Sequence, residues 1–510
     1  MFFLLLVLLV ISLILIQDFV KKRGYKWKKL SEFPGDRPLP LVGNGLDIGF
    51  DADEASFRLI KMWEKHGKQN FRLSVGSEDW LMLCEPEDIK VLLNDNFELS
   101  KPLERNAAMK PFFGYSVSTS EGERWKSVRK LMTPSFHFKA LDRAADDFGK
   151  HTQTLFELID SYEGKSPVNI YTYLKPYMLD MLSVNLFGVE KNYLKNRDHP
   201  YIKSSSKMIK IITYNYFSYW RNNSYLVRFT PLHTEMQNII RDVKQNSSDI
   251  ITQRRKILNK MIEETKSNNK NIDLNYDTFI EDKLAGGCLL DRFILSVSPN
   301  GDPEKDAIIN EEITLTLFTG HLTTSMTMCN AMYLMSLYPE VQQKVLDEQK
   351  AIFGKDFNRQ ATTQDLNDMK YLEALIKETI RFIPTIPRIG RQLQKDLKLS
   401  DGRVAPAGTS VIVFFNAAAR NPRTYTEPEK FMPERFFDTT MHPFAFVPFS
   451  AGPRNCVAFR YAWIVLKATL SNIIRRYEIL PGPEPKFAFR LITESTNGLH
   501  LHYKKRDICA

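Results

Sequence analysis

The segment FSAGPRNCVA, Phe449 to Ala458, constrains the fold of this chain more than any other feature, because it places a cysteine directly before a helical run. Gly452 allows a sharp turn, and Cys456 then lies at the N-terminal end of the predicted helix. Unsatisfied backbone amides and the positive end of the helix dipole favour a thiolate there. A thiolate beside Arg454 is a good axial ligand for haem iron. The alternative is a small buried residue in a turn.

The composition fits one large domain in a reducing compartment. The chain has 510 residues, 43% of them hydrophobic. Length alone would allow about three domains, but no Gly/Ser-rich or charge-rich linker divides the chain. The five cysteines are widely spread and form no CxxC pair, which favours a cytosol-facing body. The net charge of +10 is dispersed, so an acidic protein partner or an anionic membrane surface explains it better than nucleic acid.

The N-terminus has the features of an uncleaved membrane anchor. Residues 1–16 are apolar apart from Ser12, and a helix of this length spans about 24 Å, less than a hydrocarbon core of about 30 Å. Residues 17–20 and snorkelling lysines can close that gap. Six cations lie between Lys21 and Lys29 and none precedes the run, so the positive-inside rule keeps the body in the cytosol. A cleaved signal peptide would need a basic n-region and a small-residue cleavage site.

The rest of the chain predicts a mainly α, α+β architecture. The run 33–46 contains Pro34, Pro38 and Pro40 and is predicted to be a stiff extended connector. Helical periodicity dominates from about residue 54 to 380 and is clearest around 121–132, 305–336 and 364–382. β-branched and aromatic runs such as 409–415 predict strands clustered after Gly390. We therefore divide the chain into an anchor (1–20), a basic and Pro-rich connector (21–45) and a single body (46–510).

Two charged helical segments carry candidate functional residues. In ERWKSVRKL, Trp125 and Arg129 lie four residues apart and share one helical face. The alternative for this segment is an ordinary amphipathic helix with a buried tryptophan. In KETIR, Glu378 and Arg381 lie three residues apart and can form a bidentate ion pair. A buried ion pair needs further hydrogen bonds, and Arg435 in FMPERFF is the candidate third member.

The segment LFTGHLTTS interrupts a long apolar helix with small and polar residues. Gly320 destabilises a helix interior by about 1 kcal/mol, which suggests that another group approaches the backbone closely. The hydroxyls of Thr319 and Thr323 can compete for backbone carbonyls and bend the helix locally. This pattern suits the floor of a ligand pocket, and the alternative is helix packing through small residues.

In this order and spacing, the four segments resemble the cytochrome P-450 haem-thiolate monooxygenases. The haem-binding pattern FxxGxRxCx[G/A] is matched at 449–458, WxxxR at 125–129, ExxR at 378–381 and PERF at 433–436. The segments LPLVGN, TPSFHF and GHLTTS are most similar to the family-4 clan of microsomal members, of the insect type. The resemblance reaches from the Pro-rich connector to about residue 503. It implies the cytochrome P-450 fold, a helix-rich body with a small β-rich part, as one haem-binding catalytic domain behind the anchor helix.

The resemblance implies a role for each motif residue. Cys456 would be the fifth ligand of the iron of haem b. Thr323 stands where the family has the threonine that hydrogen-bonds dioxygen, and Gly320 would open the groove beside it. The other expected site residues are the haem-binding Trp125, Arg129, Arg391, Phe449 and Arg454, and the structural triad Glu378, Arg381 and Arg435.

Several positions depart from the family pattern. Leu322 replaces the usual acidic residue before the threonine, and leucine cannot relay a proton. Thr319 stands where many clan members have a glutamate, and in some members that glutamate bonds covalently to the haem. A threonine at this position makes such a link implausible here. Val465 and Ala419 replace a common acidic residue and a common histidine. His321 is adjacent, but one residue along a helix turns about 100° away, so it is not expected to substitute.

The resemblance implies a monooxygenase that inserts one oxygen atom from O2 into a hydrophobic substrate, a fatty acid or a lipophilic xenobiotic or endogenous compound. Electrons would come from NADPH through a separate flavoprotein reductase, with cytochrome b5 as a further candidate donor. Lys126 and Lys130 could help to dock the reductase. The expected location is the endoplasmic reticulum membrane, with the body facing the cytosol. The pocket is expected to be lined by Phe113, Leu315, Phe318 and Ile386.

Two other functions stay open at this stage. A haem-thiolate isomerase or dehydratase of lipid hydroperoxides needs no proton relay, which would make Leu322 tolerable. A non-catalytic haem protein that binds hydrophobic ligands is the other alternative, because resemblance sets the class while the site must carry the reaction.

Overall fold

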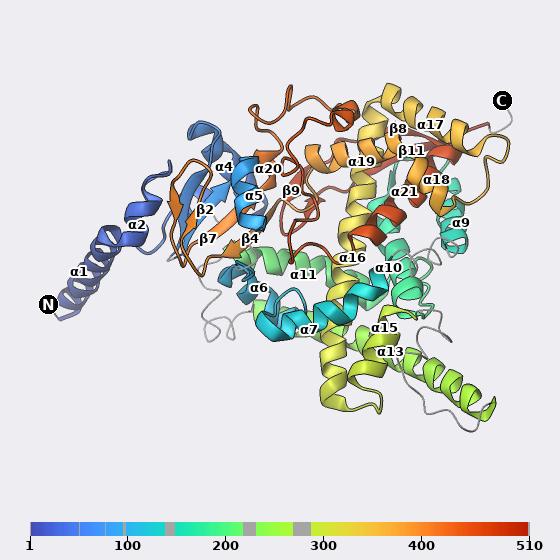
Figure 1. The fold of residues 1–510 in the computed structure, drawn as a ribbon, viewed down its shortest axis with the longest axis horizontal. Coiled ribbons are helices and arrows are strands. Elements are labelled where there is room, and N and C mark those ends of the chain that lie inside the picture. Colours follow the sequence, from blue (N-terminus) through green and yellow to red (C-terminus); the bar gives the residue numbers. More distant parts are fainter. Residues whose placement is uncertain are drawn as a thin grey trace.

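Long helices form most of the body, and the mainly α architecture predicted from the sequence is confirmed (Figure 1). Small sheets accompany them, the largest beside the N-terminal helix. The structure is a computed structural model and describes residues 2–49, 51–76, 78–94, 98–137, 148–217, 231–268 and 287–507.

The largest sheet among the described residues has the strand order β1-β2-β7-β4. β1 (Phe71–Val75) pairs antiparallel with β2 (Glu78–Leu83), and β2 pairs parallel with β7 (Ser410–Phe414). β4 (Arg388–Gln392) completes the sheet antiparallel to β7. Every residue of β7 is buried, which is typical of a strand covered on both faces. β7 lies within the predicted strand 409–415, and the sheet holds Arg391 of β4 opposite Val411.

The helix α16 (Pro303–Leu337) runs through the middle of the body (Figure 1). Asp302 caps it by accepting from the Glu304 backbone N–H, and Pro303 occupies its first position. From Ile309 onward most of its residues are buried, since α10 (Tyr171–Phe187) and other elements pack around it. A helix covered on all sides has no polar face, which explains its nearly uniform hydrophobicity.

The other motif segments form short elements around α16. α7 (Gly122–Met132) carries the WxxxR segment, and α19 (Lys370–Phe382) carries ExxR. The 3-10 helix η3 (Pro433–Phe437) carries PERF, and α21 (Phe459–Arg476) follows the cysteine loop. The periodic segment 364–382, expected to be one helix, is divided at Met369 into α18 (Thr363–Asp368) and α19.

At the N-terminus, α1 (Phe2–Arg23) extends the apolar run through the residues that follow it. Its 22 residues correspond to about 33 Å, which closes the predicted gap to a hydrocarbon core. Among the described residues, it is the one helix long and apolar enough to cross a membrane. The basic half of the connector, which was not predicted to be helical, forms α2 (Tyr25–Leu30).

The remaining described elements frame these parts. The helices are α3 (Gly45–Ile48), α4 (Ala52–Lys65), α5 (Pro86–Asn94), α6 (Leu103–Phe113), η1 (Thr133–Phe136), α9 (Phe148–Asp160), α11 (Pro200–Phe217), α13 (Pro231–Asn268), α15 (Leu289–Val297), α17 (Pro339–Phe353) and α20 (Phe415–Ala418). The strands are β3 (Val168–Asn169), β5 (Leu397–Lys398), β6 (Val404–Ala405), β8 (Tyr477–Pro481), β9 (Phe487–Phe489), β10 (Thr493–Ser495) and β11 (His500–Lys505).

Candidate active site

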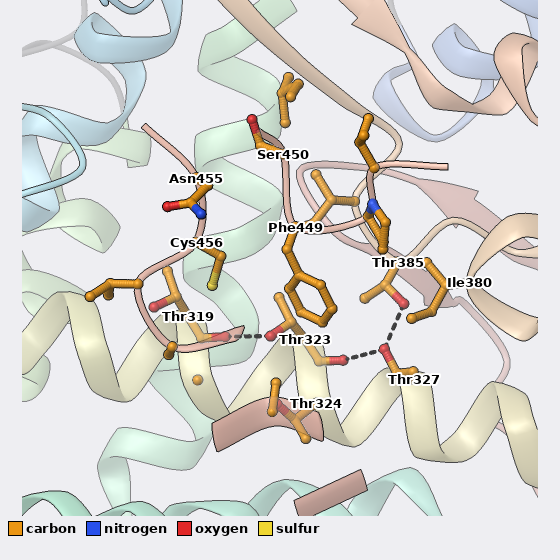
Figure 2. A pocket seen from close by; sticks show the side chains of 18 of the residues that line it. Thr319, Thr323, Thr324, Thr327, Ile380, Thr385, Phe449, Ser450, Asn455 and Cys456 are labelled. Carbon is orange, nitrogen blue, oxygen red and sulfur yellow. Dashed lines mark hydrogen bonds between the residues drawn. The ribbon is translucent and has the colours of Figure 1, made fainter. Parts of the chain in front are cut away.

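The cysteine loop turns its sulfur into a pocket. Figure 2 shows the Cys456 side chain directed toward α16, where Thr319 and Thr323 lie. The loop is closed by a hydrogen bond of 2.9 Å from the Cys456 N–H to the Phe449 carbonyl. Gly452 has a φ of 69°, and a Cβ there would lie 2.2 Å from the Leu93 carbonyl oxygen, so only glycine fits.

The Cys456 side chain is exposed, but to this internal pocket rather than to bulk solvent. Burial within the protein raises the pKa of its thiol, while the Ala458 N–H and the charge of Arg129 act in the opposite direction. The interactions predicted to stabilise a thiolate are therefore present. In the protein without a bound metal, however, the effect of desolvation on the pKa of the thiol is larger than theirs. Coordination to a metal centre reverses that balance, because a coordinating thiol loses its proton.

The pocket has a volume of about 370 Å³ and separates the cysteine loop from α16. Its lining is mostly apolar, and no Asp or Glu occurs among the described residues that line it. One wall comes from Val447, Pro448 and Phe449, and the facing wall comes from the α16 threonines. The Cys456 sulfur lies on one side of this space and the threonine hydroxyl groups lie on the other (Figure 2).

Cationic side chains gather at one part of this pocket. Lys101, Arg129 and Arg454 line it, and Arg105 and Arg391 interact electrostatically with them. Burial and then repulsion between these cations lower the pKa of Arg391 and of Arg454 to about 10. The same causes hold the pKa of Lys101 well below its usual value.

A group of buried cations without carboxylates on the pocket lining is unfavourable unless a bound anion compensates it. The two carboxylates of a haem would supply that compensation, and a sulfur ligand for its iron faces the same pocket. The residues present therefore fit a haem. Lys101 and Arg105 were missed in the sequence, because neither belongs to a motif. Their segment reaches Arg391 only through contacts with β4, such as the hydrogen bond of 2.9 Å from the Gln392 N–H to the Ser100 carbonyl.

Two predicted haem-binding arginines also organise the protein around the pocket. Arg129 donates to the backbone carbonyl and the side-chain oxygen of Asn455, at 2.8 and 2.6 Å, and so holds the cysteine loop. Arg454 donates to the carbonyls of Leu99, Val117 and Ser120. Its guanidinium also lies over the Trp125 ring, 4.5 Å from the centroid. The structure thus brings the WxxxR helix to the cysteine loop, while Arg391 is 2% exposed and lies next to Arg454.

A row of threonines on α16 faces the pocket. The hydroxyls of Thr319, Thr323 and Thr327 each donate to the carbonyl four residues earlier, at 2.8 to 2.9 Å. Thr327 also shares a hydrogen bond of 2.8 Å with Thr385, as Figure 2 shows. Because each hydroxyl proton is used within the helix, oxygen lone pairs face the pocket. The hydroxyls thus bond to backbone carbonyls as predicted, and the helix continues without a break through this segment.

Gly320 serves both alternatives considered for it. It lines the pocket, and a Cβ at this position would lie 3.0 Å from two methyl carbons of Leu182 on α10. The glycine therefore opens the pocket and also permits close packing of α10 on α16.

Leu322, at the position where the family has a proton-carrying acid, and His321 both face away from the pocket. Leu322 is fully buried in the core. The His321 Nδ1 lies 2.6 Å from the Leu317 carbonyl, and burial lowers the pKa of this imidazole to about 3. Neither residue is among the described lining of the pocket.

Glu378, Arg381 and Arg435 are brought together as the family pattern implies. Arg381 binds both oxygens of Glu378, at 2.7 and 2.8 Å, and Arg435 Nε binds Glu378 at 3.0 Å. The Met432 N–H also donates to this carboxylate, at 2.9 Å. Arg381 reaches further to the Ala419 carbonyl at 2.7 Å, and Ala419 lines the pocket. The ion pairs thus connect the PERF segment to the wall of the pocket.

The prediction of the apolar lining was wrong for three residues out of four. Ile386 lines the pocket. Phe113 and Phe318 instead contact each other in the core, with ring centroids 5.1 Å apart, and Leu315 is buried outside the lining. For Leu315 and Phe318 the reason is their position on α16, since residues one position before Thr316 and Thr319 point about 100° away from the pocket. Phe113 lies on α6 and packs against Phe318.

Comparison with known proteins agrees with this geometry. The family described as "Cytochrome P450" matches residues 33–510. Cytochrome P450 4d2 of Drosophila melanogaster is 30% identical over 98% of this chain and 98% of its own length. Probable cytochrome P450 4s3 of the same species is 31% identical over 94% of each chain. Cytochrome P450 4e5, mitochondrial, of Drosophila mettleri is 30% identical over 87% of this chain and 83% of its own length.

Proposed function

The chain belongs to the cytochrome P450 family of haem-thiolate monooxygenases, and from that premise we propose that it oxidises a hydrophobic substrate with NADPH electrons delivered by a separate flavoprotein reductase. The observation that carries the proposal is the pocket that has the Cys456 sulfur on one side and the α16 hydroxyls on the other. The part of its apolar lining that the haem would leave free suits a fatty acid or another lipophilic compound.

Haem b, when bound, supplies the activation of dioxygen, which electron density from a thiolate ligand promotes. Cys456 would hold the iron, and Phe449, which lines the same pocket, would help to exclude water from it (Figure 2). The haem carboxylates would be held by Trp125, Arg129, Arg391 and Arg454, together with Lys101 and Arg105.

Proton delivery falls to hydroxyls and water, because Leu322 carries no proton. Thr323 donates to the Thr319 carbonyl, and its oxygen can accept a hydrogen bond from a water molecule in the pocket. We assign to Thr323 the positioning of such a water, with Gly320 leaving room beside it. Every residue of this route lies on the pocket-facing side of α16.

An acidic reductase, or cytochrome b5, would approach the surface outside the cysteine loop. The side chains of Lys126 and Lys130 are exposed on α7, and Arg129 of the same helix contacts Asn455 beside Cys456. Lys126 also pairs with Glu123 at 2.7 Å. This juxtaposition places positive charge close to the sulfur side of the site, where electrons must enter.

The body 46–510 acts as one catalytic domain behind its anchor. We assign the protein to the endoplasmic reticulum membrane with the body in the cytosol, because the basic cluster follows the apolar helix α1. One relative carries the word mitochondrial in its name, so fractionation of cells into microsomes and mitochondria tests this assignment.

Isomerisation of a lipid hydroperoxide is the second candidate function, and the absence of a carboxylic acid from the described pocket lining favours it. Reconstitution separates the two. The monooxygenase needs NADPH, reductase and O2, and forms one product for each NADPH consumed at full coupling. Turnover of a hydroperoxide without NADPH or reductase, with no oxygenation in the complete system, would replace the leading proposal by the alternative.

A further inference from the structure

The basic segment after the membrane helix is packed onto the body. α2 follows α1 after a bend at Gly24. Leu30 and Phe33 are each 1% exposed, and the Trp27 ring lies under the guanidinium of Arg72, 4.6 Å away. A flexible linker would not bury such side chains. The segment is therefore part of the folded body rather than a tether.

One buried carboxylate binds cations from both sides of the bend. Asp79 of β2 is 3% exposed, and its Oδ1 accepts from Lys21 Nζ at 2.8 Å and from the Ser74 hydroxyl at 2.8 Å. Its Oδ2 lies 3.6 Å from Lys26 Nζ. Lys21 belongs to α1 and Lys26 to α2, so the carboxylate restrains the angle at Gly24.

A second set of contacts comes from the ends of the β5–β6 hairpin. The Tyr25 hydroxyl donates to Asp396 at 2.6 Å, and Lys26 Nζ donates to the Gly408 carbonyl at 2.7 Å. Asp396 is itself fixed by the Ala407 N–H at 2.8 Å. Contacts at two separate places on the body oppose rotation of α2 as well as its detachment.

We propose that Asp79 and Asp396 form a dock for the juxtamembrane helix α2, which holds the membrane anchor at a fixed angle to the body. The predicted anchor ends at Val20, one residue before Lys21, so this dock places the start of β2 at the headgroup level of the bilayer. The proposal concerns orientation and is independent of the chemistry at the haem site.

The same contacts determine which kind of lipid surface the protein fits. Lys21 and Lys26 bind Asp79, while Lys22 pairs with Asp18 at 2.6 Å and Lys29 with Glu32 at 2.8 Å. Four of the six cations between Lys21 and Lys29 are thus paired with carboxylates of the chain itself. These pairs need no lipid charge, so we expect a zwitterionic membrane to suffice for the ordering of this segment and anionic lipid to add little to it.

Trypsin tests the dock, since it cleaves after lysine and arginine in accessible, locally open segments. The full-length protein is placed in phosphatidylcholine nanodiscs, and the rate of cleavage within 21–29 is followed by mass spectrometry. We expect Asp79→Asn to accelerate this cleavage about tenfold, because a buried charge-assisted contact is lost. Tyr25→Phe, which removes the Asp396 contact, should accelerate it about threefold. Glu32→Gln, which disturbs an exposed pair within the segment, should leave the rate unchanged.

A global defect is separated from a local one by two controls. The first control is the thermal unfolding of each variant. The second is the double variant Lys21→Gln/Lys26→Gln, which leaves the sheet intact and whose cleavage by trypsin is followed at the basic residues that remain in 21–29. This double variant should match Asp79→Asn. Equal rates for wild type and both variants would overturn the proposal. So would protection of the wild type that develops only when phosphatidylserine is added to the nanodiscs, because the lysines would then bind lipid instead of Asp79.

Discussion

Glu312 gives the sharpest prediction about the body, because this carboxyl is fully buried in α16. Both of its oxygens lie within 3.0 Å of the Val117 backbone nitrogen, in the loop that forms one wall of the pocket. Burial raises the pKa of Glu312 from 4.5 to about 8. The Val117 N–H and the charge of Arg124 lower that pKa, while neighbouring Glu311 raises it.

The sign of the effect follows from proton linkage. The folded state holds the Glu312 proton more tightly than the unfolded chain, so stability is lost as pH rises from about 4.5 to about 8. At about 1.4 kcal/mol for each pH unit, the loss across that window is about 4 to 5 kcal/mol. Glu312→Gln keeps an acceptor for Val117 but cannot ionise, so the variant should not share this loss.

The assay is the unfolding temperature of the haem-loaded protein at pH 5, 6, 7 and 8, for wild type and Glu312→Gln. With an unfolding entropy of about 2.1 cal/mol/K for each residue, a body of this size shifts by about 1 °C for each kcal/mol. The variant should therefore gain about 4 °C on wild type between pH 5 and pH 8. Glu123→Gln, an exposed change on α7, should show no such trend. A difference in unfolding temperature between wild type and Glu312→Gln that stays constant with pH would show that Glu312 does not take up a proton on folding in this range.

Three further outcomes follow from the site. Gly452→Ala should abolish haem incorporation, because the new Cβ would meet the Leu93 carbonyl. Incorporation is measured as the ratio of Soret to protein absorbance, and retention of haem would show that the loop can move. Glu378→Gln should lower the free energy of unfolding in urea titrations by about 3 to 5 kcal/mol, since Arg381 is 2% exposed and loses its counter-ion. A urea midpoint equal to that of wild type would contradict the role of this ion pair. Thr323→Ala should raise the NADPH consumed per molecule of product at least about tenfold over wild type, whereas Thr324→Ala should not. An unchanged ratio of NADPH to product in Thr323→Ala counts against Thr323 as the residue that positions water.

The motif residues could be anticipated because short spacings fix local geometry. Glu378 and Arg381 lie three apart on a helix, so their pairing follows once the helix forms. Gly452 signals a turn at Cys456 for a similar reason, and its positive φ is observed. The helix α16 could be predicted from its long apolar run, and its observed bounds differ from the expected 305–336 by only a residue or two.

The site residues that could not be predicted from the sequence are brought together by contacts between distant segments. Lys101 and Arg105 join Arg391, about 290 residues later in the chain, only because their segment packs on the sheet, where the Gln392 N–H donates to the Ser100 carbonyl and the Ser410 hydroxyl donates to Glu104. Asp79 binds Lys21 across 58 residues, and no local pattern marks it as the partner of the anchor. The wrong assignment of Phe113 and Phe318 to the pocket has the same origin, since the rotation of a buried helix is set by all its neighbours.

The central claim is that Cys456 ligates haem iron in this pocket, and the difference spectrum of the reduced protein with carbon monoxide tests it directly. Wild type should show the Soret band characteristic of thiolate ligation, and Cys456→Ser should lose that band while the buried Cys329→Ser retains it. A protein that remains colourless when haem is plentiful, or a thiolate spectrum that persists in Cys456→Ser, would contradict the account.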